Sequence, residues 1–310
     1  MEIAGDAIRT VELDAAPAHC RVCPPSRPIQ AYAAREPRTR RRSGANETLS
    51  CASCGDSGPD CRNGNDFVLG RSLADRLEGV QNDWQIPFDW RPAQRPRPVT
   101  LRGRTVTLEP IDPERHTAAL WRAVRGHDEL WTWLADGPYA SEAALRLAIE
   151  EKQRGTDAVF LAILSEANGC AEGYASYMRM EPEQGVVEVG NILMTPGLQR
   201  TTAATEAMYL MARHVFEDLG YRRYEWKCNA MNEPSRRAAL RYGFTFEGIF
   251  RQHMVVKGRS RDTAWFAMLD GEWPARKRAF EAWLAPANFD GEGCQKRTLA
   301  EIRAAEAESK

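Results

Sequence analysis

The chain has 310 residues, of which 43% are hydrophobic, and a formal net charge of -1 at pH 7. This length allows one large domain with an extension, or two domains, and supplies enough apolar residues for a packed core. The near-neutral charge gives no global reason to expect binding to nucleic acid or to an anionic membrane. No apolar run approaches the roughly 18 residues of a spanning helix, and the first residues lack the pattern of a secretory signal peptide. We therefore expect a cytoplasmic protein without a membrane partner.

Residues 1–70 are predicted to be a disordered leader that contains cysteine, arginine and proline. Two pairs with metal-ligand spacing, Cys20 with Cys23 and Cys51 with Cys54, could together supply four thiolates to a zinc ion. The gap between the pairs is longer than in the usual zinc pattern, and few large apolar residues lie within it. We therefore favour reduced, unpaired cysteines and expect no metal. The arginines at 38–42 could bind nucleic acid, but a solvated charge cluster is the favoured interpretation.

The segment 71–98 is predicted to be an extended lead-in to a folded domain that spans residues 99–288. Three prolines close together, Pro92, Pro96 and Pro98, enforce an extended backbone. Residues 289–310 are expected to form a short polar helical tail.

The first half of the folded domain is predicted to begin with one strand and two helices. The strand is Thr105–Glu109, and the first helix runs from Pro113 to about Val124 with Asp112 as its N-cap. A second helix is capped by Ser141 and ends at Gly155, and we expect it to bury Leu145, Leu147 and Ile149. Three strands joined by short turns, which favour antiparallel pairing, follow at Ala158–Leu164, Gly173–Arg179 and Val186–Met194.

The second half alternates between helices and strands. A helix starts near Thr201, and Ala204, Ala207, Met208, Met211, Val215 and Leu219 recur along it at three- and four-residue steps. The remaining elements are a strand at Tyr224–Cys228, a helix from Asn232 to Tyr242 with Gly243 as its C-cap, and strands at Phe244–Phe250 and Thr263–Leu269.

The junction between Met194 and the helix near Thr201 is the strongest candidate for a ligand site. Thr195, Pro196 and Gly197 break the strand, and small side chains fill positions 201–205. The start of a helix presents free backbone N–H groups to an anion, and small side chains let the backbone come close to a phosphate. Taken alone, this stretch is equally compatible with an ordinary strand–helix unit that binds nothing.

Three stretches in this order resemble the GNAT superfamily of acyl-CoA-dependent N-acetyltransferases, and most closely the branch that acetylates the N-termini of ribosomal proteins. They are the strand from Val187-Glu188-Val189-Gly190 to Pro196, the pyrophosphate loop Gln199–Ala207, and Asn232-Glu233-Pro234-Ser235 through Gly243-Phe244 with Glu247-Gly248 beyond. The resemblance covers about residues 99–273. It implies a mixed α/β fold with three layers, in which helices flank a central, mostly antiparallel, splayed sheet.

Two positions depart from the family pattern. The first glycine of the family's loop corresponds to Thr202, whose β-branched side chain restricts the backbone. A tyrosine that often acts as the general acid corresponds to Ala239. Tyr242 lies one turn further along, and we do not transfer the acid role to it.

The resemblance implies acetyl-CoA as co-substrate and transfer of its acetyl group to a primary amine by direct attack on the thioester. The expected cofactor-binding residues are Leu193, Thr195, Gln199, Arg200, Thr201, Thr202, Ala203, Ala204, Thr205 and Asn232. Asn232 and Ser235 are expected to contact the pantetheine or the thiol. Glu188 is the candidate general base, because a carboxylate on an otherwise apolar strand is costly without a role. A purely structural role, as a partner for Arg179, is equally compatible with the sequence.

The acceptor amine is not defined by the sequence. It is expected to contact Leu130–Glu142 and Lys257–Asp262. Arg251 and His253 could line its side of the site, although a plain surface role is the favoured interpretation for each. A peptide N-terminus, a small amine and an amino sugar all remain open, as do a monomer and a homodimer. The alternative function is a non-catalytic acyl-CoA sensor whose leader binds zinc or nucleic acid.

Overall fold

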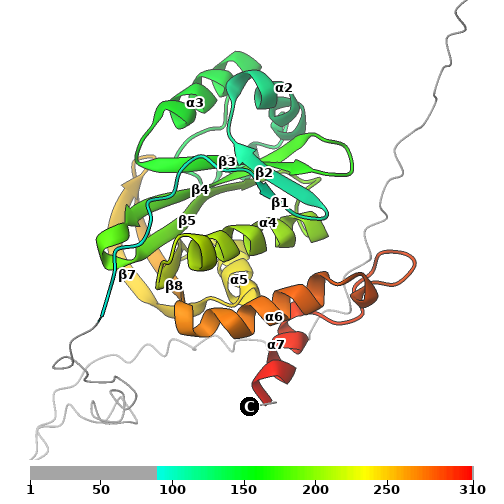
Figure 1. Cartoon of the computed structure of the whole chain (residues 1–310). Coiled ribbons are helices and arrows are strands. Elements are labelled where there is room, and N and C mark those ends of the chain that lie inside the picture. Colours follow the sequence, from blue (N-terminus) through cyan, green and yellow to red (C-terminus); the bar gives the residue numbers. More distant parts are fainter. Residues whose placement is uncertain (1–88, 309–310) are drawn as a thin grey trace, which may run out of the picture. The chain divides into compact units, whose positions relative to one another are not determined.

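The computed structural model describes residues 89–308, which form one eight-stranded sheet with helices on both faces (Figure 1). The strand order is β1-β2-β3-β4-β5-β6-β8-β7. Neighbouring strands are antiparallel except for β5 and β6, which are parallel. The predicted GNAT-like fold class is therefore confirmed. The predicted leader, with its cysteine pairs and arginine cluster, lies outside the described residues.

The element boundaries follow the predicted order. The strands are β1 Leu101–Arg102, β2 Val106–Pro110, β3 Ala158–Ser165, β4 Ala171–Glu181, β5 Val186–Met194, β6 Arg223–Asn229, β7 Thr245–Val256 and β8 Arg259–Leu269. The helices are α2 Pro113–Val124, α3 Glu142–Arg154, α4 Thr202–Arg213, α5 Glu233–Tyr242, α6 Trp273–Leu284 and α7 Leu299–Glu308. Between residues 89 and 308, none of the helices is long and apolar enough to cross a membrane.

Helices α2 and α3 begin at the predicted caps. The Asp112 carboxylate accepts hydrogen bonds from the first backbone N–H groups of α2, and the Ser141 hydroxyl does the same for α3. On α3, Leu145 and Ile149 are buried as predicted, but Leu147 is 64% exposed. The prediction for Leu147 was wrong because residues two apart point to opposite sides of a helix, whereas residues four apart share a face.

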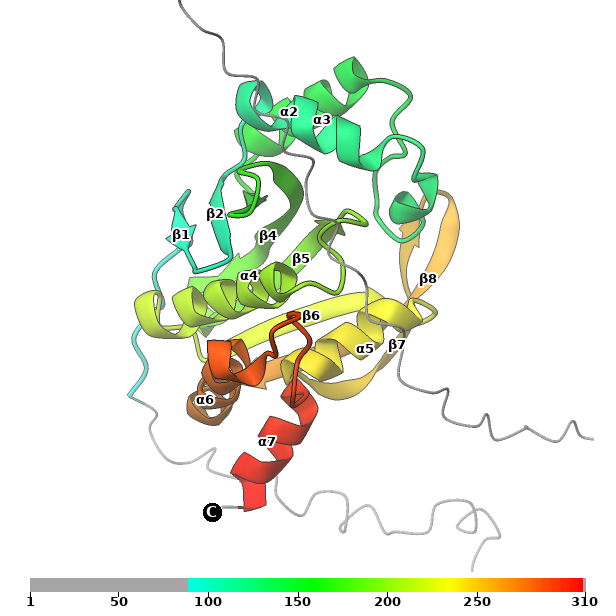
Figure 2. The ribbon, with the colours of Figure 1, turned by 90° about the vertical axis from the view of Figure 1, so that its right-hand side faces the viewer.

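The sheet separates two hydrophobic cores. Helices α2 and α3 cover one face of the N-terminal strands, and α4, α5 and α6 lie on the other side of the sheet (Figures 1 and 2). The larger core continues into α7 through Leu299 and Ile302, which are 1% and 4% exposed. Part of the predicted polar tail therefore belongs to the core, and α6, which the sequence analysis did not identify, connects it to α4.

A buried carboxylate fastens α4 to the turn between β1 and β2. Glu206 accepts hydrogen bonds from the N–H groups of Arg104 (2.8 Å) and Thr105 (2.7 Å), and from the Thr105 hydroxyl (2.5 Å). A Cβ atom at Gly103 would lie 2.6 Å from the Glu206 side chain, so only glycine fits this approach. The start of α4 is thereby held at a fixed position against the edge of the sheet.

We predict that Glu206→Ala lowers the free energy of unfolding by about 2–4 kcal/mol, because two backbone N–H groups lose their acceptor. Urea unfolding of the purified protein measures this change. Glu151→Ala, which removes an exposed carboxylate on α3, should change stability by less than about 0.5 kcal/mol. Equal, small effects of the two substitutions would show that Glu206 does not anchor α4.

Candidate active site

Strands β5 and β6 pair over only part of their length. Their parallel register runs from Val186 opposite Arg223 to Val189 opposite Trp226. Beyond these residues β5 continues to Met194 along β4, and β6 continues to Asn229 along β8, without pairing with each other. Backbone groups that face this separation lack a ladder partner, so an extended ligand with amide groups can bind between the strands.

The N-terminus of α4 follows directly from the end of β5. Thr201 is the N-cap, and its hydroxyl accepts a hydrogen bond from the Ala204 N–H (3.1 Å). An α-helix provides no internal acceptor for the N–H groups of Thr202 and Ala203. The one non-glycine residue of this loop in the left-handed region is Arg200, with φ of 62°. Thr202 therefore needs no glycine-like backbone, and two amides are left to bind an anion.

The other predicted contacts of the loop are partly occupied within the protein. The Thr195 N–H donates to the Glu172 carbonyl, and the Thr195 carbonyl accepts from Leu198 and Gln199. Its hydroxyl, however, is buried without any hydrogen-bond partner among the described residues. The Gln199 side chain donates to the Met194 carbonyl (2.9 Å). Thr195 can thus meet a ligand only through its hydroxyl.

Asn232 and Ser235 lie at the start of α5, where the chain leaves β6. The Asn232 side-chain oxygen caps the helix by accepting from the Ser235 N–H (3.1 Å). The Ser235 hydroxyl accepts from the Trp226 indole N–H (3.0 Å). The Asn232 amide N–H groups are donors for a ligand. The Ser235 hydroxyl is a further donor that is also within reach of the Cys228 thiol, whose pKa burial raises and Ser235 lowers.

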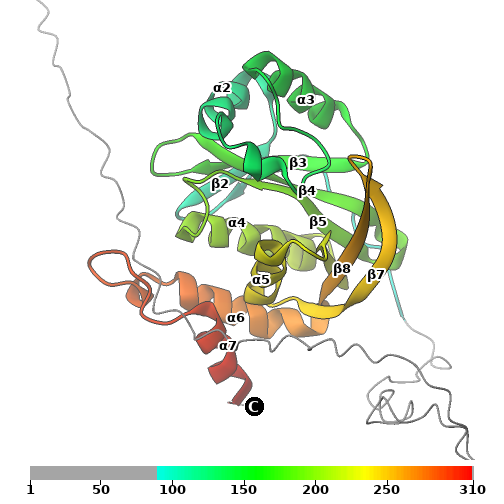
Figure 3. The same cartoon turned by 180° about the vertical axis from the view of Figure 1, so that it is seen from behind.

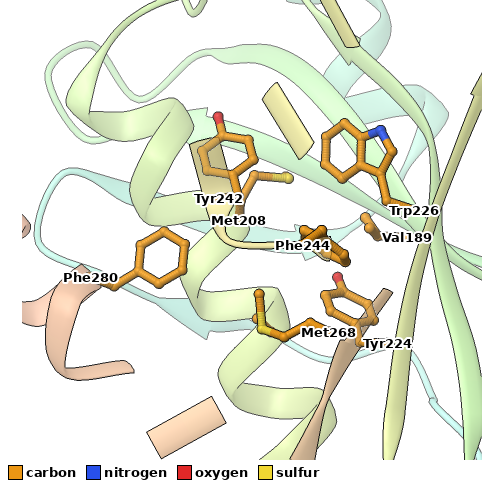
Figure 4. Close-up of a pocket in the computed structure, with 9 residues that line it drawn as sticks. Val189, Met208, Tyr224, Trp226, Tyr242, Phe244, Met268 and Phe280 are labelled. Carbon is orange, nitrogen blue, oxygen red and sulfur yellow. The ribbon is translucent and has the colours of Figure 1, made fainter. Parts of the chain in front are cut away.

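On the α4 side of the sheet, the core beside Val189 and Trp226, the last paired residues of β5 and β6, leaves no room for a ligand. Figure 4 shows Val189, Trp226 and Tyr242 among the residues around a cavity of about 10 Å³. This volume holds one water molecule at most, and the lining is apolar. Burial raises the pKa of Tyr242, whose ring lies in this core. A ligand between β5 and β6 must therefore end near Val189 and Trp226.

The opposite side of the same strands carries a cluster that we call the charged face, formed by Arg179, Glu188, Glu225, Lys227, Arg261 and Trp265. Glu188 Oε2 lies 2.9 Å from Arg179 Nη1 and 3.1 Å from Lys227 Nζ. Lys227 Nζ also lies 2.6 Å from Glu225 and 3.8 Å from the centre of the Trp265 ring. Glu188, Glu225 and Lys227 are each less than 8% exposed. The predicted pairing of Glu188 with Arg179 is thus present, and Lys227 is a second partner.

Arg179 and Lys227 both make their closest contacts with the same oxygen of Glu188. That oxygen is Oε2, whereas Oε1 lies near Gly190, the first residue of β5 after the pairing with β6 ends. A Cβ at Gly190 would lie 2.4 Å from the Met178 sulfur, so a side chain does not fit there. Burial raises the pKa of Glu188, although Lys227 and Arg179 oppose the shift. The carboxylate therefore binds a proton more readily than an exposed one, as a general base requires.

The two segments predicted to recognise the acceptor meet in the structure. Lys257 Nζ, at the turn of the β7–β8 hairpin, donates to the Trp131 carbonyl between α2 and α3 (2.9 Å). Figures 2 and 3 show the hairpin rising from the sheet toward these helices. His253 lies on this hairpin and its Nδ1 is 3.0 Å from the Thr263 hydroxyl. Arg251 lines an open pocket beside it with Gln252.

Several members of the charged face were not identified from the sequence. Glu225 and Lys227 lie two residues apart on β6, so their side chains share one face of the strand. Charged residues at alternating positions of a largely apolar strand were a usable signal for a buried ionic cluster. Arg261 and Trp265 gave no such signal, because their positions depend on how β8 pairs with β7 and β6.

The chain matches the acetyltransferase (GNAT) domain family over residues 105–245. A GCN5-related N-acetyltransferase from Brucella melitensis has a similar structure, with a TM-score of 0.68 and 48% identity, covering 70% of this chain and 99% of that one. A protein from Chromobacterium violaceum assigned to the GNAT family is 40% identical, with a TM-score of 0.57 over 61% of this chain and 95% of its own. Bacillus subtilis YdaF, named provisionally as a ribosomal N-acetyltransferase, is 24% identical over 58% of this chain and 95% of its own.

The chain belongs to the GCN5-related N-acetyltransferase (GNAT) family, and it is an N-acetyltransferase. The resemblance that the three sequence motifs indicated is thus confirmed.

We predict that Lys227→Met destabilises the protein by about 3–5 kcal/mol, because two buried carboxylates lose their shared cation. The pKa of Glu188, already raised by burial, should rise further. A buried carboxyl with a raised pKa loses stability as the pH increases through that pKa. The destabilisation should therefore be larger at about pH 8 than at about pH 5.

Urea unfolding at the two pH values measures this effect. The control Lys277→Met removes a half-exposed lysine that pairs with Glu217 on the other side of the sheet, and it should cost less than about 1 kcal/mol. A loss for Lys227→Met that does not depend on pH would contradict the role assigned to Lys227.

Proposed function

We propose that this enzyme transfers an acetyl group from acetyl-CoA to a primary amine by direct attack of the amine on the thioester. The observation that carries the proposal is the separation of β5 and β6 after Val189 and Trp226, with the N-terminus of α4 at its mouth. Family membership supports acetyl transfer in general, and the site residues give the more specific mechanism.

The pyrophosphate of acetyl-CoA would bind at the start of α4. The N–H groups of Thr202 and Ala203 point out of the helix without internal acceptors, and the positive end of the helix dipole favours an anion there. Arg200, exposed in the turn before the helix, can add a charge-assisted hydrogen bond. Small side chains at this turn leave room for the phosphate oxygens.

The pantetheine arm would lie between β5 and β6. Its amides can pair with backbone groups of β5 around Leu193, and the unpartnered Thr195 hydroxyl is a further hydrogen-bonding group at the entrance. The Asn232 amide reaches the same region from the start of α5. Because the core is closed below Val189 and Trp226, the arm would end there, with its thioester close to Glu188.

Glu188 would act as the general base. A protonated amine has no lone pair for attack, and a lysine-like amine has a pKa of about 10.4. The ammonium proton would pass to Oε1 of Glu188, directly or through a water molecule. The neutral amine nitrogen would then bond to the acetyl carbon as the bond from carbon to sulfur breaks, and the second proton lost by the nitrogen would pass to the CoA thiolate. The Ser235 hydroxyl can donate a hydrogen bond to the departing thiolate, since Trp226 already occupies it as an acceptor.

We predict that acetyl-CoA raises the melting temperature of the wild-type protein and that Thr202→Glu abolishes this shift. A ligand at 100 times its Kd stabilises a protein by about 2.7 kcal/mol. A carboxylate at the first position of α4 favours the helix but repels the pyrophosphate, so this variant should fold. Thermal unfolding with and without acetyl-CoA is the measurement.

The matched control is Thr202→Gln, which has nearly the same size without the charge and should retain most of the shift. Equal protection of the Thr202→Glu variant would exclude the start of α4 as the pyrophosphate site.

We predict that Glu188→Gln lowers kcat by about 10²- to 10⁴-fold, because proton removal by a positioned base is lost. In the wild type, kcat/KM should fall as the pH decreases through the pKa of Glu188, which lies above its ordinary value of 4.5. This acidic limb should be absent from the variant. Release of free thiol, followed across an amine library and a pH series, measures both effects.

The control for Glu188→Gln is Glu225→Gln, which makes the same change beside the same lysine. If both variants lose the same fraction of kcat, Glu188 acts through the ion-pair cluster and not as the base. That outcome would favour the structural role that the sequence left open.

A further inference from the structure

The charged face contains one cation without a counterion. Glu188 pairs with Arg179 and Lys227, and Glu225 pairs with Lys227 and with Arg223 (2.7 Å). The Arg261 side chain has no ion pair or hydrogen bond with another residue in the range 89–308, and its Nε is buried without an acceptor. A buried N–H group normally has an acceptor, so the Nε–H of Arg261 is a donor that a bound ligand could use.

Arg261 lies beside the proposed catalytic carboxylate. On β8 it stands opposite Met254 of β7, whose sulfur lies 3.8 Å from the Arg179 guanidinium that binds Glu188. Desolvation lowers the pKa of Arg261, and Cys228 and then Glu188 oppose this shift through their charges. The unpaired cation and the candidate base therefore lie on the same face of the sheet.

Further cations lie near Arg261. The pKa of His253 is lowered by desolvation and then by Arg179, Arg261 and Lys227. Trp265, two positions beyond Thr263 on the same face of β8, has a buried indole N–H without an acceptor. Around the base there are thus unused donors and an unused positive charge, which suit an anionic group of a ligand.

An open pocket lies at the bulge of β7, where Arg251 and Gln252 line it. The hairpin turn is fixed to the α2–α3 segment through Lys257 and Trp131, so the aromatic pair Phe250 and Trp265, stacked at 4.4 Å, is held beside the pocket.

We propose that Arg261 binds a carboxylate of the acceptor, and that the acceptor is therefore a small amino acid. The amine would be directed to Oε1 of Glu188 and the carboxylate to the two terminal nitrogens of Arg261, which match its geometry. A polyamine or an amino sugar would instead bring a further positive charge to an unpaired guanidinium. This inference rests on the proposed acetyl transfer.

The test compares free amino acids with their carboxamides as acceptors, at saturating acetyl-CoA. For the wild type we expect kcat/KM to be about 10- to 100-fold higher for the acid, the range of a charge-assisted hydrogen bond. Arg261→Gln should remove this preference by weakening the acid alone, mainly through KM, and Arg261→Lys should restore part of it. Arg278→Gln on α6, where the arginine pairs with Glu306, should leave the preference unchanged.

Thermal protection by acetyl-CoA shows that each variant is folded. It also distinguishes a failure of the role of Arg261 from a failure of the proposed acetyl transfer. If the wild type is protected and acetylates carboxamides, polyamines or amino sugars as efficiently as amino acids, the role of Arg261 is refuted while acetyl transfer stands. If no amine is acetylated and acetyl-CoA gives no protection, the proposed function itself fails. A preference for the acid that survives in Arg261→Gln also refutes the inference.

Discussion

The site depends on the early end of pairing between two parallel strands. β5 and β6 share a ladder only up to Val189 and Trp226, and each then follows a different antiparallel neighbour. A small-residue turn leads from the separated end of β5 into α4, whose start carries amides without internal acceptors. The same separation brings the charged face, on the other side of the sheet, next to the space between the strands. One irregularity in a ladder thus joins an anion-binding helix start to a buried carboxylate.

Electrostatics divides the charged face into two parts with different roles. Lys227 lies between Glu188 and Glu225 and against the Trp265 ring, where its charge is compensated within the protein. Such a buried group fixes the carboxylates in position but contributes little net stability. Arg261 is not compensated in this way. Lys227 therefore orients the candidate base Glu188, and Arg261 provides a charge for a ligand.

Local sequence signals predicted most elements of the fold, because caps and periodicity are local. Asp112, Ser141 and Gly243 mark helix ends in the sequence, and each occupies the cap predicted for it. These local signals do not predict contacts between elements that are far apart in the sequence. Leu147 is exposed because it lies two residues from both Leu145 and Ile149, on the opposite side of α3. Leu299 is buried because α7 packs on α6 and α5, a tertiary contact with no local signal. At the site, motifs led to the α4 loop and Glu188, whereas Arg261 emerges only once the register of β8 with its neighbours is known.

The hydrogen bonds of Glu206 have a consequence for how a ligand is received. They hold the first turns of α4 against the backbone of Arg104 and Thr105. A helix end that is already rigid loses little conformational freedom when an anion arrives. The amides at this end are therefore preorganised, and affinity there is governed by charge and fit instead of by ordering of the chain.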